Sequence, residues 1–326
     1  MSIIEVKNLT KDFGRGRGVF DVSFTVQKGE VFGFLGPNGA GKTTTMRHLM
    51  GFTRPQKGKT NILSKDSWSQ HHEVKDHIGY LPGEISLPDH LTGAGFIKQM
   101  AGFRKIKDLS YANELTERFA LDTSIRLKRM SLGTKRKLAI VTAFLHDPDV
   151  LLLDEPTGGL DPLMQDNFIQ FIREEKKRGK TILLSSHIFS EVDATCDKIA
   201  IIKEGKLVST FSADELKHNA RKEWKVEFAS IDELEKFCQK DFEISFVKKG
   251  ANQVHVVFYD KDANRFLAEL SNYKVNFFSE IKFTLEDYFM KFYSQAKRES
   301  RPSVLGHDRT SADFTKFRKE GESHVK

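Results

Sequence analysis

Long hydrophobic runs are missing from this 326-residue sequence. The longest unbroken aliphatic run, Val150–Leu153, is far shorter than the roughly 20 apolar residues that cross a bilayer. The residues that follow Met1 also lack the basic start and apolar block of a signal peptide. We therefore expect a cytoplasmic chain, with any membrane pore supplied by another protein.

Cysteine is scarce, with only Cys196 and Cys238 in the whole sequence. Their spacing matches no CxxC or metal-ligand pattern, so we expect reduced residues in a reducing compartment. Charge of one sign does not gather in long blocks either. The net charge of +7 allows an anionic lipid surface, a nucleic acid or simple solubility, and the interspersed signs favour a solvated surface.

Strand and helix signals alternate over the first two thirds of the chain. Residues 3–9 and 19–27 alternate apolar and polar side chains, as two paired antiparallel strands do. The later segments are typical of a parallel α/β core. They are a strand at 31–35, a helix through about Met50, a helix from about Lys135 to His146, a strand at 150–153, a helix at about 163–178 and a strand at 181–185.

The pattern changes after about residue 220, where short strands and helices predict a small α+β module with a possible split βαβ arrangement. Ser230 and Glu233 have the spacing of a helix capping box. The polar, basic residues 297–326 have the composition of a disordered tail. The predicted division is therefore 1–218, with a helical subdomain at about 84–145, then 219–296 and 297–326.

A phosphate-binding motif lies at Gly36–Thr44, between a predicted strand and a predicted helix. Its glycines permit a tight loop whose backbone N–H groups, with the helix N-terminus, bind phosphates. Lys42 is suited to the β- and γ-phosphates, and Thr43 offers a hydroxyl to Mg²⁺. The predicted ATP-binding residues of this loop are Gly36, Asn38, Gly39, Ala40, Gly41, Lys42, Thr43 and Thr44.

Two carboxylates, Asp154 and Glu155, follow the aliphatic strand at 150–153. Open α/β sheets bind ligands at the carboxyl ends of their strands. Asp154 is suited to hold Mg²⁺ through water, and Glu155 to orient and polarise an attacking water. Together with the phosphate-binding loop they predict a phosphoryl-transfer site, with ATP and Mg²⁺ as its ligands.

Further motifs resemble those of the ABC (ATP-binding cassette) ATPase family. Met130–Thr134 looks like a variant of the LSGGQ signature, Pro156–Pro162 resembles the D-loop, and Thr181–His187 resembles the strand that leads to the switch histidine. Phe13 stands where the family places an aromatic ring against adenine. The motifs follow the family's order, and the resemblance covers residues 1 to about 215.

The resemblance implies a P-loop NTPase of ABC type, with an N-terminal antiparallel β subdomain, a helical subdomain and a small C-terminal α+β module. In that family two cassettes face each other and trap two ATP molecules. Ser131 and the backbone at Gly133 would then contact the γ-phosphate on the opposite cassette, and His187 would sense the γ-phosphate on its own. Ser131 is also suited simply to cap its helix, and both roles are compatible.

The sequence departs from the family pattern at several positions. The expected Q-loop glutamine is replaced by Gly83, and Glu84 follows it as an alternative link to Mg²⁺. Leu132 and Thr134 replace the usual Gly and Gln of the signature. These variants, and the ending Thr284–Phe289, resemble the branch that contains drug and peptide-antibiotic exporters.

A run of basic residues flanks the signature. Such a run is usually a solvated face, although it would also raise the local concentration of ATP. Its members are Arg126, Lys128, Arg129, Lys135, Arg136 and Lys137.

The resemblance favours an ATP-hydrolysing exporter subunit that acts at the cytoplasmic face of the membrane through a transmembrane permease subunit and a second cassette, homo- or heterodimeric. An alternative is a nucleic-acid-associated ABC ATPase of translation or repair. Against it, the chain carries one motif set, no sustained heptads interrupt residues 45–130, and no nucleic acid is expected. An importer ATPase is the third possibility.

Overall fold

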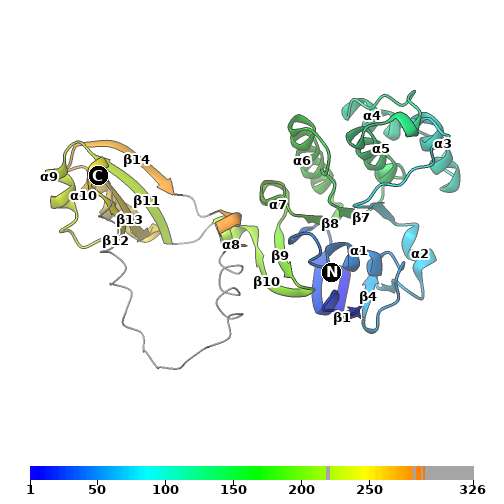
Figure 1. Ribbon diagram of the computed structural model, residues 1–326, viewed down its shortest axis with the longest axis horizontal. Coiled ribbons are helices and arrows are strands. Elements are labelled where there is room, and N and C mark those ends of the chain that lie inside the picture. Colours follow the sequence, from blue (N-terminus) through cyan, green and yellow to red (C-terminus); the bar gives the residue numbers. More distant parts are fainter. Residues whose placement is uncertain (218–220, 282–283, 288, 291–326) are drawn as a thin grey trace, which may run out of the picture.

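The computed structural model of this protein describes residues 1–217, 221–281, 284–287 and 289–290 (Figure 1). Three β-sheets organise these residues. The predicted tail at 297–326 lies outside the described residues.

The first sheet is antiparallel and has the strand order β2-β1-β4-β5. The alternation read from the sequence places Val22 and Val26 of β2 and Ile4 of β1 in its buried face. Because β2 also approaches β10 of the second sheet, this sheet packs beside the phosphate-binding loop. The strands are β1 (Ser2–Asp12), β2 (Gly18–Gln27), β4 (Lys57–Ile62) and β5 (Lys65–Asp66).

The second sheet is the core, with the order β10-β9-β3-β8-β7-β6. Every neighbouring pair from β9 to β6 is parallel, and β10 pairs antiparallel at one edge. The carboxyl ends of β3, β8 and β7 therefore lie side by side. The strands are β3 (Val31–Leu35), β6 (Ile78–Leu81), β7 (Val150–Asp154), β8 (Thr181–Ser186), β9 (Lys198–Lys203) and β10 (Lys206–Ser212).

Helices cover the core sheet, and α3, α4 and α5 form a helical lobe at its β6 edge that shares its hydrophobic core (Figure 1). The strands β3, β7 and β8 are buried along their whole length, as a sheet covered on both faces requires. The helices are α1 (Lys42–Leu49), α2 (His71–Lys75), α3 (Gly93–Phe103), α4 (Ser110–Arg118), a 3₁₀ turn (Leu127–Arg129), α5 (Leu132–Phe144), α6 (Pro162–Lys177), α7 (Phe189–Thr195) and α8 (Ala213–Lys217).

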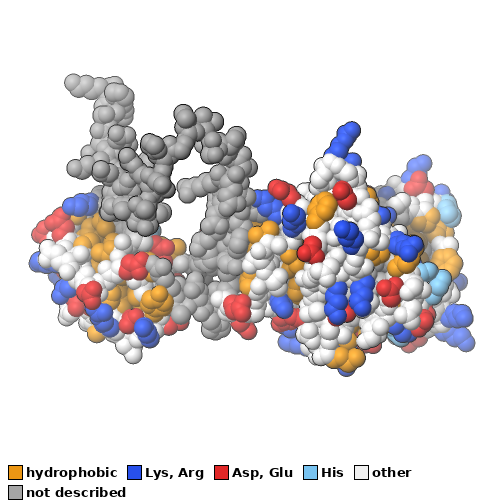
Figure 2. All heavy atoms as spheres, turned by 90° about the horizontal axis from the view of Figure 1, so that it is seen from below, with side chains coloured by type: hydrophobic (Ala, Val, Ile, Leu, Met, Phe, Trp, Pro, Cys, Tyr) orange, Lys and Arg blue, Asp and Glu red, His pale blue; other side chains and the backbone are white. Residues whose placement is uncertain are grey.

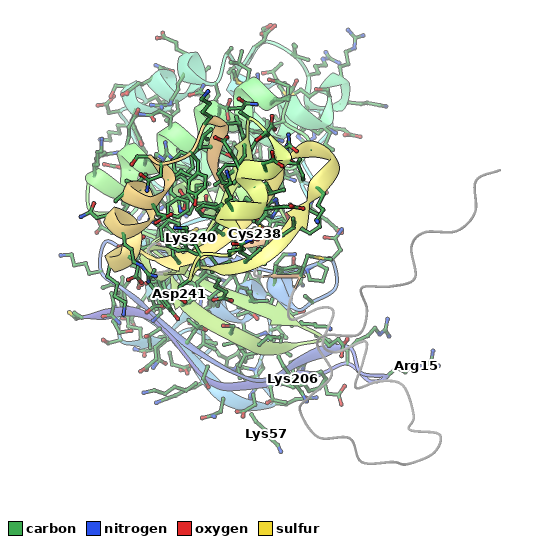
Figure 3. All side chains as sticks on the ribbon, turned by 90° about the vertical axis from the view of Figure 1, so that its left-hand side faces the viewer. Arg15, Lys57, Lys206, Cys238, Lys240 and Asp241 are labelled. Carbon is green, nitrogen blue, oxygen red and sulfur yellow. The ribbon has the colours of Figure 1, made fainter. Side chains whose placement is uncertain are left out.

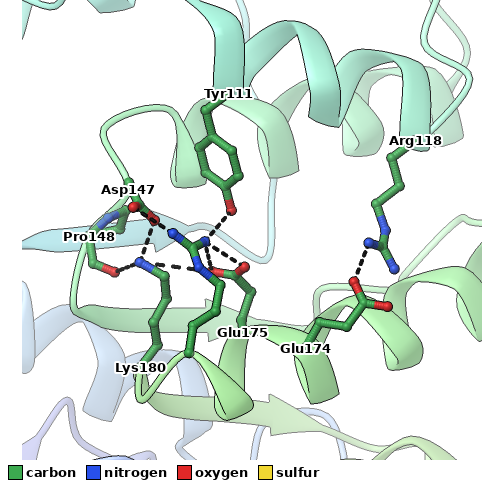
Figure 4. Close-up of polar contacts among 8 residues, drawn as sticks. Tyr111, Arg118, Asp147, Pro148, Glu174, Glu175 and Lys180 are labelled. Carbon is green, nitrogen blue, oxygen red and sulfur yellow. Dashed lines mark hydrogen bonds and ion pairs between the residues drawn. The ribbon is translucent and has the colours of Figure 1, made fainter.

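Polar contacts join the helical lobe to α6 (Figure 4). On α4, Arg118 bonds to Glu174 at 2.5 Å, and the Tyr111 hydroxyl accepts a hydrogen bond from Arg178 at 3.1 Å. Arg178 in turn forms an ion pair with Asp147 at 2.7 Å. The lobe is thus tied to the core near the amino ends of β7 and β8, whereas Glu155 and His187 follow their carboxyl ends.

The third sheet lies in the C-terminal unit and has the order β12-β13-β11-β14, antiparallel throughout. This is the split βαβ arrangement, and the Ser230 hydroxyl caps α9 by accepting from the Glu233 backbone N–H. Its elements are β11 (Arg221–Phe228), α9 (Ile231–Phe237), β12 (Glu243–Lys248), a 3₁₀ turn (Lys249–Ala251), β13 (Gln253–Tyr259), a 3₁₀ turn (Asp260–Asp262), α10 (Ala263–Leu270) and β14 (Val275–Ile281).

The C-terminal unit has its own core, in which Phe228, Phe237 and Phe266 are fully buried. After β14 the chain returns to the part of the molecule that contains the second sheet. Leu285 and Phe289 there belong to the same hydrophobic core as β3, β7 and β8. The Phe289 ring lies 5.0 Å from that of Phe189 on α7. Within the described residues, the structure contains no helix with the length and apolar character of a membrane span.

Candidate active site

The phosphate-binding loop connects β3 to α1 and is packed too closely for side chains at two of its glycines. A β-carbon on Gly36 would lie 2.4 Å from the Ile202 carbonyl oxygen, and one on Gly41 would lie 2.8 Å from Val19. Gly41 also has φ of 109°, in the left-handed region that favours glycine. Backbone N–H groups of this loop are thus held at the start of a helix, where anions bind.

Lys42 is 5% exposed and lies under this loop. Its ammonium group donates hydrogen bonds to the carbonyl oxygens of Gly36 at 2.5 Å and Pro37 at 3.2 Å. It also forms an ion pair with Glu155 Oε1 at 2.9 Å. The lysine is therefore positioned at the loop and already in contact with a carboxylate, so a bound phosphate competes with that carboxylate for it.

Glu155 follows β7 with a left-handed backbone, at φ of 50°. Non-glycine residues adopt this conformation at a cost, and it tends to occur at functional sites. The Glu155 N–H donates to the Ser185 carbonyl oxygen at 3.0 Å, which holds the turn against β8. This turn directs the carboxylate back over the strand ends instead of along the sheet.

His187 follows β8 and completes a polar group with Glu155. Its Nδ1 lies 2.5 Å from Glu155 Oε2, while Oε1 of the same carboxylate contacts Lys42. The three residues come from the ends of β3, β7 and β8, which are neighbours in the sheet. Parallel pairing therefore brings together Lys42, Glu155 and His187, which are far apart in the sequence.

Asp154 is fully buried at the end of β7. One carboxylate oxygen accepts a hydrogen bond from the Ser185 hydroxyl, and the other, Oδ2, has no hydrogen-bond partner among the described residues. A buried carboxylate oxygen without a partner is costly, and a cation offsets that cost. The donor set of Asp154 and the exposed Thr43 hydroxyl fits Mg²⁺, which keeps several waters and takes few protein ligands.

The loop after β6 places Gly83, not Glu84, against Asp154. A β-carbon on Gly83 would lie 3.0 Å from Asp154 Oδ2, so a longer side chain at position 83 would reach the predicted metal position. Glu84 is the next residue and is exposed. Its role at the metal stays a prediction.

Phe13 lies just after β1 with 53% of its side chain exposed. The Lys11 ammonium group lies 5.8 Å from the ring centre. An exposed ring beside a cation has a free face on which a planar base can stack. The geometry is compatible with the predicted adenine contact.

Ser131 caps α5, as the sequence allowed. Its hydroxyl oxygen accepts a hydrogen bond from the Thr134 backbone N–H at 3.1 Å, and the residue stays exposed. Gly133 lies so close to the D-loop that a β-carbon there would be 2.7 Å from the Gly159 carbonyl oxygen. Leu132 is 60% exposed, which leaves an apolar side chain on this face.

The basic run beside the signature is not wholly a solvated face, because one of its members, Arg136, is buried. Its side chain is 4% exposed, and it donates to the carbonyl oxygens of Pro82 at 2.9 Å, Gly83 at 2.7 Å and Gly158 at 3.0 Å. Burial lowers its pKa, while the charges of Asp154, Glu155 and Glu191 act to raise it. This arginine joins α5 to the loop after β6 and to the D-loop.

The remaining predicted residues lie in the same loop. Ala40 is buried and Thr44 is half-buried, whereas Asn38 and Gly39 are exposed. Within the phosphate-binding loop, the exposed residues are therefore those around the tip, where a phosphate has access.

Comparison with known proteins finds similarity over the residues that form this site. Residues 19–158 match the ABC transporter family. An uncharacterised ABC transporter ATP-binding protein of Bacillus subtilis, YhcH, is 40% identical over 214 residues, which is 64% of this chain and 69% of that protein. The bacitracin transport ATP-binding protein BcrA of Bacillus licheniformis is 32% identical over 298 residues, 89% of this chain and 97% of that protein.

A solved structure of an ATP-binding subunit of an ABC transporter has the same fold. It aligns with a TM-score of 0.61 and 30% sequence identity, and the match covers 66% of this chain and 92% of that one. The similarity is therefore concentrated in the two sheets that carry the site, whereas the match to the bacitracin protein extends into the C-terminal unit.

Proposed function

Because this chain belongs to the ABC transporter ATP-binding proteins, which bind and hydrolyse ATP, we propose that it drives export through a separate transmembrane permease subunit. The chain acts at the cytoplasmic face of the membrane, held there by that partner. Its cargo belongs to the class of hydrophobic drugs or antimicrobial peptides. The match to BcrA over nearly the whole of both chains supports this class.

The observation that carries the proposal is the group formed by Lys42, Glu155 and His187 at three adjacent strand ends. When ATP binds, Lys42 transfers from Glu155 to the β- and γ-phosphates. The freed Glu155 carboxylate orients and polarises the attacking water, and His187 contacts the γ-phosphate. Positioning and charge stabilisation of this kind account for most of the catalysis of phosphoryl transfer.

Mg²⁺ would be held by Thr43 and Asp154, and when bound it neutralises charge on the phosphate oxygens. Glu84 remains a proposed link between this position and the permease. The surface near Tyr80–Phe103, which includes Glu84, is the proposed contact for the permease's cytoplasmic helix.

A second cassette completes the site. Ser131 and Gly133 are exposed enough to reach a γ-phosphate held by a facing copy or relative, and the N-terminus of α5 there favours an anion. ATP then favours the closed pair, and loss of the γ-phosphate releases it. This is a population shift by a ligand that binds one state better.

A tagged full-length chain purified from detergent-solubilised membranes tests the export function. We expect a polytopic membrane protein to co-purify and the chain's ATPase rate to depend on it. A labelled drug or peptide should be taken up by inverted membrane vesicles and exported from whole cells. On the face drawn in Figure 2, Lys and Arg side chains are interspersed with Asp and Glu, and such a mixed surface is not the basic patch that binds nucleic acid.

In Figure 3, Arg15 and Lys57 point away from the first sheet, and Lys240 and Asp241 follow α9, where each pairs with a residue of opposite charge on α10. Recovery of RNA or DNA in a nuclease-sensitive complex, without a membrane protein, would favour the nucleic-acid alternative. A requirement for an extracellular binding protein would favour import.

Replacing Phe13 by alanine is expected to weaken ATP binding about tenfold, because stacking a base on an aromatic ring contributes about 1–3 kcal/mol. Titration of the purified chain with a fluorescent ATP analogue measures the change in Kd. Phe103→Ala removes a ring that is 73% exposed on α3 and serves as the matched control. Equal affinities of the Phe13 variant and the wild type would remove the adenine contact from the site.

A further inference from the structure

Glu191 is a buried acidic residue that lies outside the phosphate-binding and metal-binding motifs. It is on α7 and only 2% exposed, although glutamate is almost never buried without partners. Its Oε2 accepts a hydrogen bond from the Ser186 hydroxyl at 2.5 Å. Ser186 immediately precedes His187, so the contact fixes the turn that carries the histidine.

The same serine closes the turn and joins it to the phosphate-binding loop. Its hydroxyl oxygen accepts from the Ile188 backbone N–H at 2.9 Å, and its carbonyl oxygen accepts from the N–H of Gly36 at 3.3 Å. His187 thus lies between Ser186 and Ile188, which are joined by this hydrogen bond. The same hydroxyl donates its hydrogen to Glu191, so the carboxylate fixes its orientation.

Glu191 also reaches the segment that follows Glu155. Burial raises its pKa to about 7, the side chains of Ser186 and Thr157 act to lower it, the Glu155 charge raises it and the Arg136 charge lowers it. Thr157 is buried, and its carbonyl oxygen accepts from the N–H of Leu160 at the D-loop. One carboxyl group therefore bonds to the residue before His187 and lies near Thr157, which follows Glu155 by two residues.

One face of α7 borders a cavity. A cavity of about 290 Å³ lies between α6 and α7, and its lining includes Thr157, Asp166, Arg173 and Glu191. Glu191 Oε1 has no hydrogen-bond partner among the described residues. Val192 packs one face of α7 into the core, and the hydrogen bond of Glu191 to Ser186 fixes the face that borders this cavity.

We propose that Glu191 is a positioning residue for ATP hydrolysis, whose buried carboxyl group holds the Ser186 turn beside Thr157 so that His187 meets Glu155. The proposal rests on the proposed hydrolytic roles of Glu155 and His187. Glu191 does not contact the nucleotide itself. Its removal therefore lowers turnover without a matching loss of ATP affinity.

The experiment uses the full-length chain with Glu191→Ala, Glu191→Gln and the matched control Asp193→Asn, an exposed carboxylate on the same helix. Single-turnover phosphate release and ATP titration are measured for each. We expect Glu191→Ala to lower turnover at least about thirtyfold and to change ATP affinity by less than about threefold. Glu191→Gln, whose amide oxygen still accepts from Ser186, should recover most of the lost rate.

Combining Glu191→Ala with His187→Ala separates positioning from general damage. If Glu191 acts through His187, the second substitution lowers turnover by less than about threefold in the His187→Ala background. An equal thirtyfold loss in both backgrounds, or full turnover in Glu191→Ala, overturns the proposal. If Glu191→Ala does not fold, Ser186→Ala removes the same hydrogen bond and takes its place in the cycle.

The proposed function fails separately from this inference. If Glu155→Gln hydrolyses ATP at the wild-type rate, the assignment of the hydrolytic site is wrong, and the inference is overturned with it. If Glu155→Gln is inactive and Glu191→Ala is fully active, the site stands and only the role of Glu191 is rejected.

Discussion

Replacing Glu155 by glutamine is expected to lower ATP hydrolysis by about 10²- to 10⁴-fold, the usual contribution of a positioned general base. The amide keeps the shape of the side chain but no longer polarises the attacking water. ATP binding should be retained or strengthened. In the structure Lys42 pairs with the Glu155 carboxylate at 2.9 Å, and a neutral amide competes less with the γ-phosphate for that lysine.

Phosphate release and size-exclusion chromatography in ATP check this expectation together. The variant should accumulate as an ATP-bound dimer, whereas the wild type hydrolyses ATP and returns to the monomer. Glu114→Gln, an exposed glutamate on α4, is the matched control and should behave as the wild type. Hydrolysis by the Glu155 variant within tenfold of the wild-type rate would contradict the assigned role.

Replacing Arg136 by alanine is expected to lower the free energy of unfolding by about 3 kcal/mol. Three carbonyl oxygens lose their partner, and each buried polar group left unpaired costs about 1–3 kcal/mol, less where water enters. For a domain of this size the melting temperature should fall by about 6–12 °C. ATP hydrolysis should fall as well, because Gly83 and Gly158 adjoin Asp154 and Glu155.

Thermal unfolding of the purified chain measures the change in stability. Arg129→Ala removes an exposed arginine just before α5 and should leave the melting temperature within about 1 °C of the wild type. Arg136→Lys keeps the charge but cannot reproduce the planar fork that serves three acceptors, so it should recover little. An unchanged melting temperature in Arg136→Ala would show that the three contacts do not stabilise the fold.

The strand–loop–helix motif at Gly36–Thr44 was readable from the sequence because local chemistry dictates it. Glycines are needed where the chain adopts positive φ or packs closely, and the loop must start a helix to bind phosphate. The buried strands at Val31–Leu35 and Val150–Asp154 were readable for a similar reason, since continuous apolar runs mark strands covered on both faces.

The burial and contacts of Arg136 and Glu191 could not be predicted in this way. A run of basic residues does not tell which member turns inward on a helix, and Arg136 is the member that faces the core. Glu191 follows His187 by four residues without any motif of its own. The partners of Arg136 are backbone carbonyls in loops that lie far away in the sequence, so periodicity carries no sign of them. The partner of Glu191, Ser186, is only five residues away, but that spacing alone does not show that the carboxylate is buried.

By itself, the sequence determined the family, the buried strands of the core sheet and the position of the predicted phosphate-binding loop, because each of these depends on local residue types and spacing. Only the tertiary structure decided which side chains meet. Parallel pairing of β3, β8 and β7 brings Lys42, His187 and Glu155 to one edge. Such contacts depend on strand order and on the burial of distant groups, which a linear pattern of residues does not specify.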